Sequence, residues 1–182
     1  MKATGIVRRI DDLGRVVVPK EIRRTLRIRV GDPLEIFTDR DGAVILKKYS
    51  PVGELSAFSE DYAESLAKAT GDIVCITDKE QVIAVAGSGK KGLLEQRLSG
   101  QLESAIEARE EILASSKDRR YRRLLETQEP EFLYQAVAPI VCEGDAVGAV
   151  VLLSKEVGKT FGEAELLLVR TAAAFFGKQM EQ

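Results

Sequence analysis

Charge is distributed so unevenly along this chain that a single uniform domain describes it poorly. Residues 1–50 carry twelve Lys or Arg against seven Asp or Glu, a net charge of +5, whereas the other 132 residues carry fifteen against twenty-two, a net of −7. The break at Ser50-Pro51-Val52-Gly53 marks the boundary. We therefore expect a basic domain at 1–50, a linker at 51–54 and an acidic domain at 55–182. Because phosphate attraction depends on local charge, the basic part is expected to bind a polyanion.

Composition excludes several classes of function. The chain has no histidine, which removes Ser-His and Cys-His catalytic pairs and histidine-ligated zinc. Cys75 and Cys142 lie far apart in apolar runs, so we expect buried, reduced thiols. No apolar signal segment opens the sequence, and the longest apolar run, 146–153, is too short to span a membrane. We expect a cytoplasmic protein that is not an enzyme, with no catalytic residue, cofactor or metal and no contact with membranes.

The basic domain is expected to fold as a hairpin, a short helix and a second hairpin. Short β-branched runs surround the turn residues Asp11-Asp12, Pro19 suits the first turn of a helix, and Gly42 is free to take a positive φ. The expected strands are 5–10, 13–18, 33–37 and 43–48, and the expected helix is 20–26.

These fifty residues are expected to need a partner chain. So short a segment rarely buries enough apolar surface to fold alone. Its runs Val16-Val17-Val18 and Val44-Ile45-Leu46 are apolar on both faces of their strands, which favours strands that are covered on both sides. The sequence therefore predicts an obligate dimer of interleaved chains.

The short helix predicts a cationic surface. At 100° per residue its basic residues fall within an arc of about 100°, with Ile22 and Leu26 roughly 130° from the centre of that arc and Glu21 outside it. Arginines on the first hairpin extend the patch, and their planar fork suits phosphate or guanine edges. A merely solvated basic face is the alternative. The expected DNA-binding residues are Arg8, Arg9, Arg15, Lys20, Arg23, Arg24 and Arg27.

The N-terminal sequence closely resembles the swapped-hairpin DNA-binding domain of the AbrB transition-state regulators. The resemblance rests on 4–19, TGIVRRIDDLGRVVVP, and 21–26, EIRRTL. It implies that two N-terminal segments interleave into a β-barrel, and that Arg8, Arg9, Arg15, Arg23 and Arg24 occupy DNA-contacting positions. It also implies recognition of flexible, AT-rich DNA shape more than of a strict sequence. The family also uses lysine at the position of Arg9, which favours a phosphate contact there.

Two amphipathic helices are expected to bracket the acidic domain. The first, 54–69, has an apolar stripe of Leu55, Phe58, Tyr62, Leu66 and Ala69. The second, 161–181, opens on a Thr160/Glu163 capping box and has a stripe of Ala164, Leu167, Leu168, Thr171, Phe175 and Met180. Strands are expected at 72–77, 81–86, 111–114, 132–142 and 145–154, and helical segments near 93–108. This order predicts an α+β fold with an antiparallel sheet.

The acidic domain resembles a GAF domain. The runs 138–141, 148–151 and 179–182 are similar to those of sporulation regulators that join an AbrB-type domain to a GAF-type module. The resemblance implies a domain for effector sensing or for tetramer assembly: a small-molecule effector of unknown identity would bind to it, or helices 54–69 and 161–181 would pair with those of another subunit. The alternative is that the apolar stripes cover the sheet of their own chain.

Two further segments have sequence patterns that fit more than one function. Gly87–Gly92 matches the G-x-G-x-x-G motif of dinucleotide-binding proteins. The preceding strand, however, is expected to be the second arm of a hairpin, so a plain strand-to-helix loop is favoured. The run 117–123, KDRRYRR, is a second basic cluster for which DNA flanks, an anionic effector or acidic residues of another subunit are candidate partners, and a solvated loop is favoured.

The leading hypothesis is a homo-oligomeric, double-stranded-DNA-binding transcription regulator of sporulation-stage genes. An antitoxin-like DNA-binding protein is the first alternative, since swapped-hairpin domains also serve antitoxins, but the regular apolar periodicity of residues 55–182 argues against a disordered toxin-binding tail. A nucleotide-handling enzyme built on the glycine loop is the second.

Overall fold

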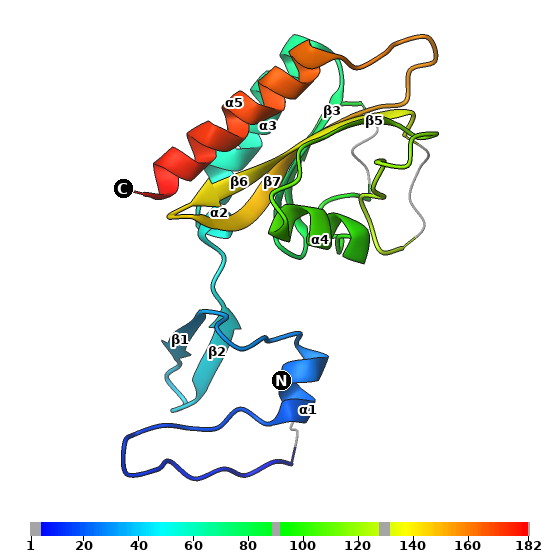
Figure 1. Cartoon of the computed structure of the whole chain (residues 1–182). Helices are drawn as coiled ribbons and strands as arrows, with labels where there is room; N and C mark the ends of the chain where they lie inside the picture. Colours follow the sequence, from blue (N-terminus) through cyan, green and yellow to red (C-terminus); the bar gives the residue numbers. More distant parts are fainter. Residues whose placement is uncertain (1–4, 89–91, 128–131, 182) are drawn as a thin grey trace. The chain divides into compact units, whose positions relative to one another are not determined.

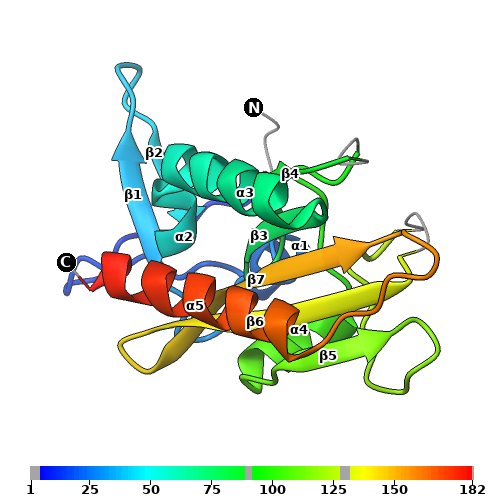
Figure 2. The ribbon, with the colours of Figure 1, turned by 90° about the horizontal axis from the view of Figure 1, so that it is seen from above.

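The computed structural model describes residues 5–88, 92–127 and 132–181. The chain separates into two compact units, Met1–Tyr49 and Ser50–Gln182. Figures 1 and 2 label their helices and strands. We call them the N-terminal unit and the C-terminal unit.

The described residues of the N-terminal unit form one short helix and one regular hairpin. Helix α1 is Lys20–Thr25, and strands β1 (Leu34–Thr38) and β2 (Val44–Lys48) pair antiparallel. The hairpin turn forms because the Asp39 carboxylate accepts hydrogen bonds from the backbone of Asp41 and Ala43, at 3.0 and 2.8 Å. Gly42 takes a φ of +79°. The predicted helix and second hairpin are confirmed.

The strands predicted at 5–10 and 13–18 are absent from the described part of the N-terminal unit. This segment forms two extended arms joined by a turn at Asp11–Gly14, where the Asp11 amide donates to the Arg15 carbonyl at 3.1 Å and the Gly14 amide donates to the Asp11 carbonyl at 2.9 Å. The arms have no further strand to pair with in a single chain, and a lone hairpin is marginally stable. For the same reason the described residues form no closed barrel.

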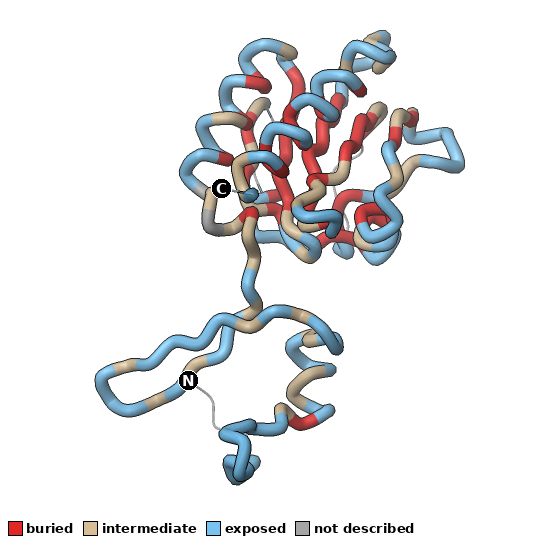
Figure 3. Tube along the Cα trace, turned by 60° about the vertical axis from the view of Figure 1, so that its left-hand side comes forward, coloured by how far each residue is buried: buried red, intermediate tan, exposed pale blue. Residues whose placement is uncertain are grey.

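The N-terminal unit buries almost none of its apolar side chains. Within residues 5–49 only Pro19 is buried, and Figure 3 shows the contrast with the C-terminal unit. Val7 is 85% exposed, Ile10 70%, Val17 69% and Val30 93%. The remaining large apolar residues that are exposed here are Ile6, Leu13, Val16, Leu26, Ile36, Phe37, Val44, Leu46 and Tyr49. Residues 5–49 of one copy therefore form no hydrophobic core.

The C-terminal unit is built on a five-stranded antiparallel sheet. Its strands are β3 (Ile73–Asp78), β4 (Val82–Ala86), β5 (Ile112–Ser115), β6 (Tyr134–Cys142) and β7 (Asp145–Ser154). They lie in the order β4-β3-β7-β6-β5, and every neighbouring pair is antiparallel. The expected strands and sheet type are confirmed. Long β-branched runs form the central strands because both faces of the sheet are covered.

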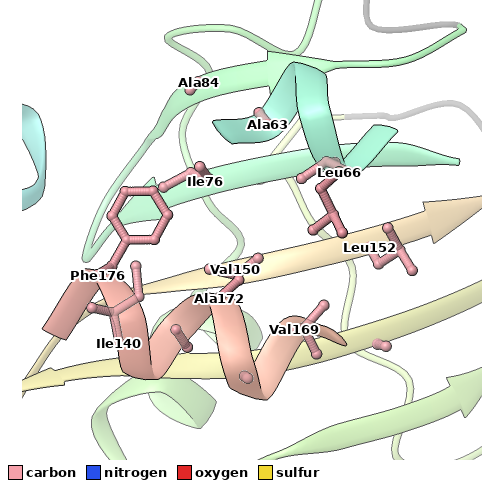
Figure 4. Close-up of a cluster of buried hydrophobic side chains, with 14 of the residues drawn as sticks. Ala63, Leu66, Ile76, Ala84, Ile140, Val150, Leu152, Val169, Ala172 and Phe176 are labelled. Atoms are coloured by element: carbon pink, nitrogen blue, oxygen red, sulfur yellow. The ribbon is translucent and has the colours of Figure 1, made fainter. Parts of the chain in front are cut away.

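Three helices cover one face of this sheet: α2 (Pro51–Glu54), α3 (Ser56–Thr70) and α5 (Glu163–Met180). Helices α3 and α5 lie side by side in Figure 2. Figure 4 shows the core beneath them, where Val169, Ala172 and Phe176 of α5 meet Ile140, Val150 and Leu152 of the sheet. The segment expected as a linker is thus the helix α2, capped by the Ser50 hydroxyl, with Val52 fully buried.

A second core fills the other face. It includes Leu102 and Ile106 of α4 (Gly100–Glu107), Leu93 and Leu98 before that helix, and Phe132. Helix was expected from about residue 93, yet 92–99 forms turns, because Gln81 and Arg97 pair as an isolated bridge and the Ser99 hydroxyl caps α4 by accepting from the Leu102 amide.

The expected stripe on α5 does not face the sheet. Its sheet-facing residues are Leu166, Val169, Ala172, Ala173, Phe176 and Gly177, whereas Leu167 is 60% exposed, Phe175 41% and Leu168 39%. On α3 the buried residues include Ser59, Ala63 and Leu66, and Ala69 is exposed. The interpretation that the α5 stripe covers its own sheet is therefore wrong. The expected capping box is also misplaced, because Gly162 is the N-cap and Glu165 accepts from its amide at 2.7 Å.

Both cysteines are free thiols. Cys75 is buried as expected, but Cys142, at the end of β6, is only half-buried. Among the described residues, no helix is long and apolar enough to cross a membrane.

Candidate nucleic-acid interface

The turn at Asp11–Gly14 fixes the geometry of the first two arms. The Asp11 carboxylate accepts hydrogen bonds from the Leu13 and Arg15 amides, at 3.0 and 2.8 Å, and from the Arg15 guanidinium at 2.8 Å. The hydrogen bonds from the Arg15 backbone, and then from its side chain, lower the pKa of this carboxyl. Gly14 closes the turn with a φ of +76°. One acidic side chain therefore organises the turn.

The arms place three of the predicted contact residues in solvent. Arg8 and Arg9 are exposed on the first arm, and the Arg15 side chain is 69% exposed on the second although it pairs with Asp11. An ion pair this exposed is weak, so Arg15 can exchange Asp11 for a phosphate at small cost.

Helix α1 presents two cations outward. Pro19 is its N-cap, and its fixed φ favours a helix start there. Lys20 and Arg24, one turn apart, are exposed and contribute, with Glu21 and Thr25, to the lining of an open hollow. Exposed cations one helical turn apart can contact the phosphates of a duplex.

The other two helix cations are placed differently from the sequence expectation. Arg23 is half-buried, and its Nε donates to the Val18 carbonyl at 3.2 Å. Arg27 lies beyond α1, which ends at Thr25, and takes a φ of +52°. The structure thus brings Lys20 and Arg24 together, turns Arg23 toward the backbone, and removes Arg27 from the helical face.

Asp11 is the positioning residue that the sequence reasoning overlooked. Its signal in the sequence is an Asp three residues before a Gly, the pattern of a turn whose side chain accepts from the backbone amides that follow. That pattern was visible in Asp11-Asp12-Leu13-Gly14.

The strand before the glycine loop does not belong to a dinucleotide-binding unit. This strand, β4, pairs antiparallel with β3 and so is not part of a βαβ unit. Gly87 has a φ of +102°, and a Cβ there would lie 2.4 Å from the Asp72 carbonyl oxygen, which accounts for this glycine by packing alone. Residues 89–91 of the loop lie outside the described residues.

In comparisons with known proteins, the two parts of the chain match different families. Residues 54–181 match the family described as stage V sporulation protein T C-terminal, transcription factor. Residues 7–54 match the family described as antidote-toxin recognition MazE, bacterial antitoxin. The transition state regulatory protein AbrB of Bacillus subtilis is 47% identical over 85 residues, which cover 46% of this chain and 88% of AbrB.

The C-terminal unit has the GAF fold. A GAF domain from an Acinetobacter phosphoenolpyruvate-protein phosphotransferase superposes with a TM-score of 0.57 at 17% identity, covering 74% of this chain and 84% of that domain. At this identity the likeness concerns the fold alone.

One relative is similar to this chain over its whole length, and so over both units. Stage V sporulation protein T of Bacillus subtilis is 54% identical over 182 residues, which cover 100% of both chains. Together with the match over residues 54–181, this similarity makes the protein a regulator and not an enzyme. The chain belongs to the stage V sporulation protein T family of transcription factors.

Proposed function

We propose that this protein regulates sporulation-stage transcription in the cytoplasm by binding duplex DNA through its N-terminal unit. The observation that carries the proposal is the exposed pair Lys20 and Arg24 on α1, close in sequence to the exposed Arg8, Arg9 and Arg15. Cations distributed over a turn and a helix can follow phosphates and groove width without one recognition helix. Arg23 and Arg27 complete the proposed set after rearrangement of their present contacts.

Two chains are proposed to interleave in order to build this surface. The support is the exposed apolar surface of residues 5–49, which one copy leaves in water at an unfavourable free energy. The arms at 5–18 would gain strand partners from the second chain, and the proposed interleaving closes the barrel that one copy lacks.

A second contact is proposed between C-terminal units, which would join two dimers into a tetramer. Phe58 and Tyr62 of α3 and Phe175 and Phe176 of α5 form one aromatic cluster, with ring centroids 5.3 to 6.3 Å apart. Phe58 is 37% exposed and Phe175 41%, and Leu167 extends the same apolar surface on α5. Helices with such faces pack against a second pair. A small-molecule effector of the GAF-like unit remains part of the proposal.

The match of residues 7–54 to an antitoxin family favours one alternative, a toxin-binding antitoxin. The C-terminal unit has two hydrophobic cores of its own, whereas a toxin-wrapping tail is expected to order on its partner. We therefore favour the regulator.

Substitution of one exposed cation tests the DNA contact. Arg24→Ala is expected to weaken duplex binding of the full chain by about tenfold, because a charge-assisted phosphate or base contact contributes about 1–3 kcal/mol. The matched control is Arg40→Ala, which removes one exposed positive charge from the turn between β1 and β2. Fluorescence anisotropy with a labelled duplex measures both. Equal affinities of the two variants would contradict the proposed surface.

A further inference from the structure

A second cationic surface lies on the C-terminal unit, whose sequence is otherwise acidic. The loop after β5 contains five Lys or Arg residues in the seven positions 117–123. Four of them, Lys117, Arg119, Arg120 and Arg123, are exposed. Among the described residues, no salt bridge joins these four side chains to an acid. We call these four residues the loop cations.

The one acid inside the loop, Asp118, is exposed, and its carboxylate is bonded to the loop itself. The Asp118 carboxylate accepts hydrogen bonds from the Ser115 amide at 2.8 Å and the Ser115 hydroxyl at 2.9 Å, and the Asp118 carbonyl accepts from the Tyr121 amide at 3.1 Å. These bonds from Ser115, and then the nearby charge of Arg120, lower the pKa of Asp118. Asp118 therefore shapes the turn, and the exposed charge of the loop stays positive because the four loop cations outnumber this one acid.

Buried polar side chains hold the loop backbone in place. Gln135 of β6 is fully buried; its Oε1 accepts from the Arg122 amide at 2.7 Å and its Nε2 donates to the Arg122 carbonyl at 2.8 Å. The buried Ser99 hydroxyl donates to the Arg123 carbonyl at 2.5 Å. Buried hydrogen bonds of this kind are costly to break, so the loop is presented in one conformation.

The remaining side chains of the loop support it from within. Arg122 donates to the Arg119 carbonyl at 2.8 Å and pairs with Glu110 at 3.5 Å. Tyr121 packs against the second core. The loop thus divides its residues between those that fix its shape and the loop cations that face solvent.

The chemistry of this surface selects a polyanion over a folded protein partner. A protein interface needs an apolar anchor at its centre, and the one aromatic residue of the loop packs inward. Exposed arginines offer forked donors that match phosphate oxygens and release counterions when they bind. A duplex already held by the N-terminal unit of the same chain has a high effective concentration near the C-terminal unit.

We propose that the loop cations bind the phosphate backbone of the duplex that the N-terminal unit recognises, as a second contact independent of base sequence. This inference rests on the proposed DNA binding by the N-terminal unit. The second contact lengthens the DNA footprint and makes affinity depend more steeply on salt.

Salt titration of two matched variants of the full chain tests the proposal. The loop variant is Lys117→Gln, Arg119→Gln and Arg120→Gln. The control variant is Lys68→Gln, Lys79→Gln and Lys178→Gln, which removes the same three charges from exposed sites outside the loop. Affinity for a labelled duplex of about 40 base pairs is measured from about 50 to 200 mM salt, and sedimentation reports the assembly of each variant.

We plot the logarithm of affinity against the logarithm of salt concentration. If one loop per complex contacts DNA, the slope for the loop variant is expected to be shallower than the slope for the control by about 3, since each lost phosphate contact contributes about 0.9. The affinity lost between about 50 and 200 mM salt is then about 40-fold smaller for the loop variant. Equal slopes would overturn the proposal while leaving N-terminal DNA binding intact. A loop variant that sediments as a smaller assembly than the control would assign the loop to a contact with another copy. Failure of the unsubstituted protein to bind the duplex would instead defeat both proposals.

Discussion

At the scale of single residues, Asp11 is the side chain on which the proposed surface depends most. Its carboxylate accepts two backbone amides and the Arg15 guanidinium, so it sets the turn from which Arg8, Arg9 and Arg15 extend. Because its pKa is lowered in the folded chain, the ionised form is the one that the turn stabilises. The contribution is complete above the ordinary pKa of aspartate and is lost as the pH falls through the lowered value.

Comparison of Asp11→Ala with Asp12→Ala isolates this role. Both substitutions remove one negative charge, which alone strengthens attraction to phosphate. Asp12→Ala is therefore expected to bind a duplex as tightly as the unsubstituted chain or slightly more tightly. Asp11→Ala is expected to bind several-fold more weakly, because the arms lose their turn. The account is wrong at this point if both variants gain affinity in an anisotropy titration.

Only some of the proposed contact residues could be placed from the sequence. Helical geometry placed Lys20 and Arg24 on one face, and both are exposed. It also placed Arg23 and Arg27 there, but a six-residue helix is too short for a helical wheel to hold. Arg27 follows the helix end, and the Arg23 side chain donates to the Val18 carbonyl just before the helix. Neither outcome is encoded in residue spacing.

At the scale of elements, α5 rests on β6 through a glycine that helix propensity alone would not favour. A Cβ on Gly177 would lie 2.2 Å from the Val141 carbonyl oxygen, a backbone atom that cannot move aside cheaply. A glycine inside a helix normally costs about 0.5–1 kcal/mol relative to alanine. Gly177 therefore indicates close approach of the helix to the strand.

Gly177→Ala is expected to destabilise the protein by about 1–3 kcal/mol, against the gain that helix propensity predicts, because the added methyl overpacks the contact. Gly100→Ala, at the start of α4, is the control: nothing lies within 4 Å of its Cβ position, so this change is expected to be neutral or stabilising. Thermal unfolding of both variants shows whether each substitution raises or lowers stability. A more stable Gly177→Ala variant would show that α5 does not approach the Val141 carbonyl this closely.

Sequence periodicity did not indicate which face of α5 packs on the sheet. Leu166, Leu167 and Leu168 are consecutive, so the helix is apolar around much of its circumference and several stripes fit the 3.6-residue period. The sheet buries Leu166 and leaves Leu167 and Leu168 more exposed. By contrast, the sheet strands were predicted well, because their β-branched runs end at clear turns such as Glu143-Gly144.

The exposed α5 face gives a prediction about assembly. Leu167→Glu combined with Phe175→Glu is expected to halve the sedimenting mass of the full chain, since charged side chains disfavour burial at the proposed helix contact. The fold of the C-terminal unit should persist in circular dichroism because neither side chain is fully buried in one copy. Arg170→Glu would break the pair that joins α5 to Glu111, so Lys178→Glu serves as the charge control, because its pair with Glu181 lies at the end of the same helix and joins no other element. Unchanged mass in the double variant would exclude this contact.

At the scale of the whole molecule, the two units solve the problem of burial differently. The C-terminal unit covers both faces of its sheet within one chain, whereas the N-terminal unit leaves its apolar side chains in water. The sequence anticipated this difference, because fifty residues with two-sided apolar strands cannot build a core. It also predicted strands at 5–18 that one copy does not form, because a strand is defined by its neighbour and the expected neighbour belongs to another chain.

The salt dependence of duplex binding by the unsubstituted full chain tests the central claim most directly. Two interleaved N-terminal units would neutralise six or more phosphates, so the logarithm of affinity is expected to fall against the logarithm of salt concentration with a slope steeper than about −5. Measurable binding in dilute buffer with that slope is the predicted result. A slope near zero, or no binding to any duplex even at low salt, would contradict the account.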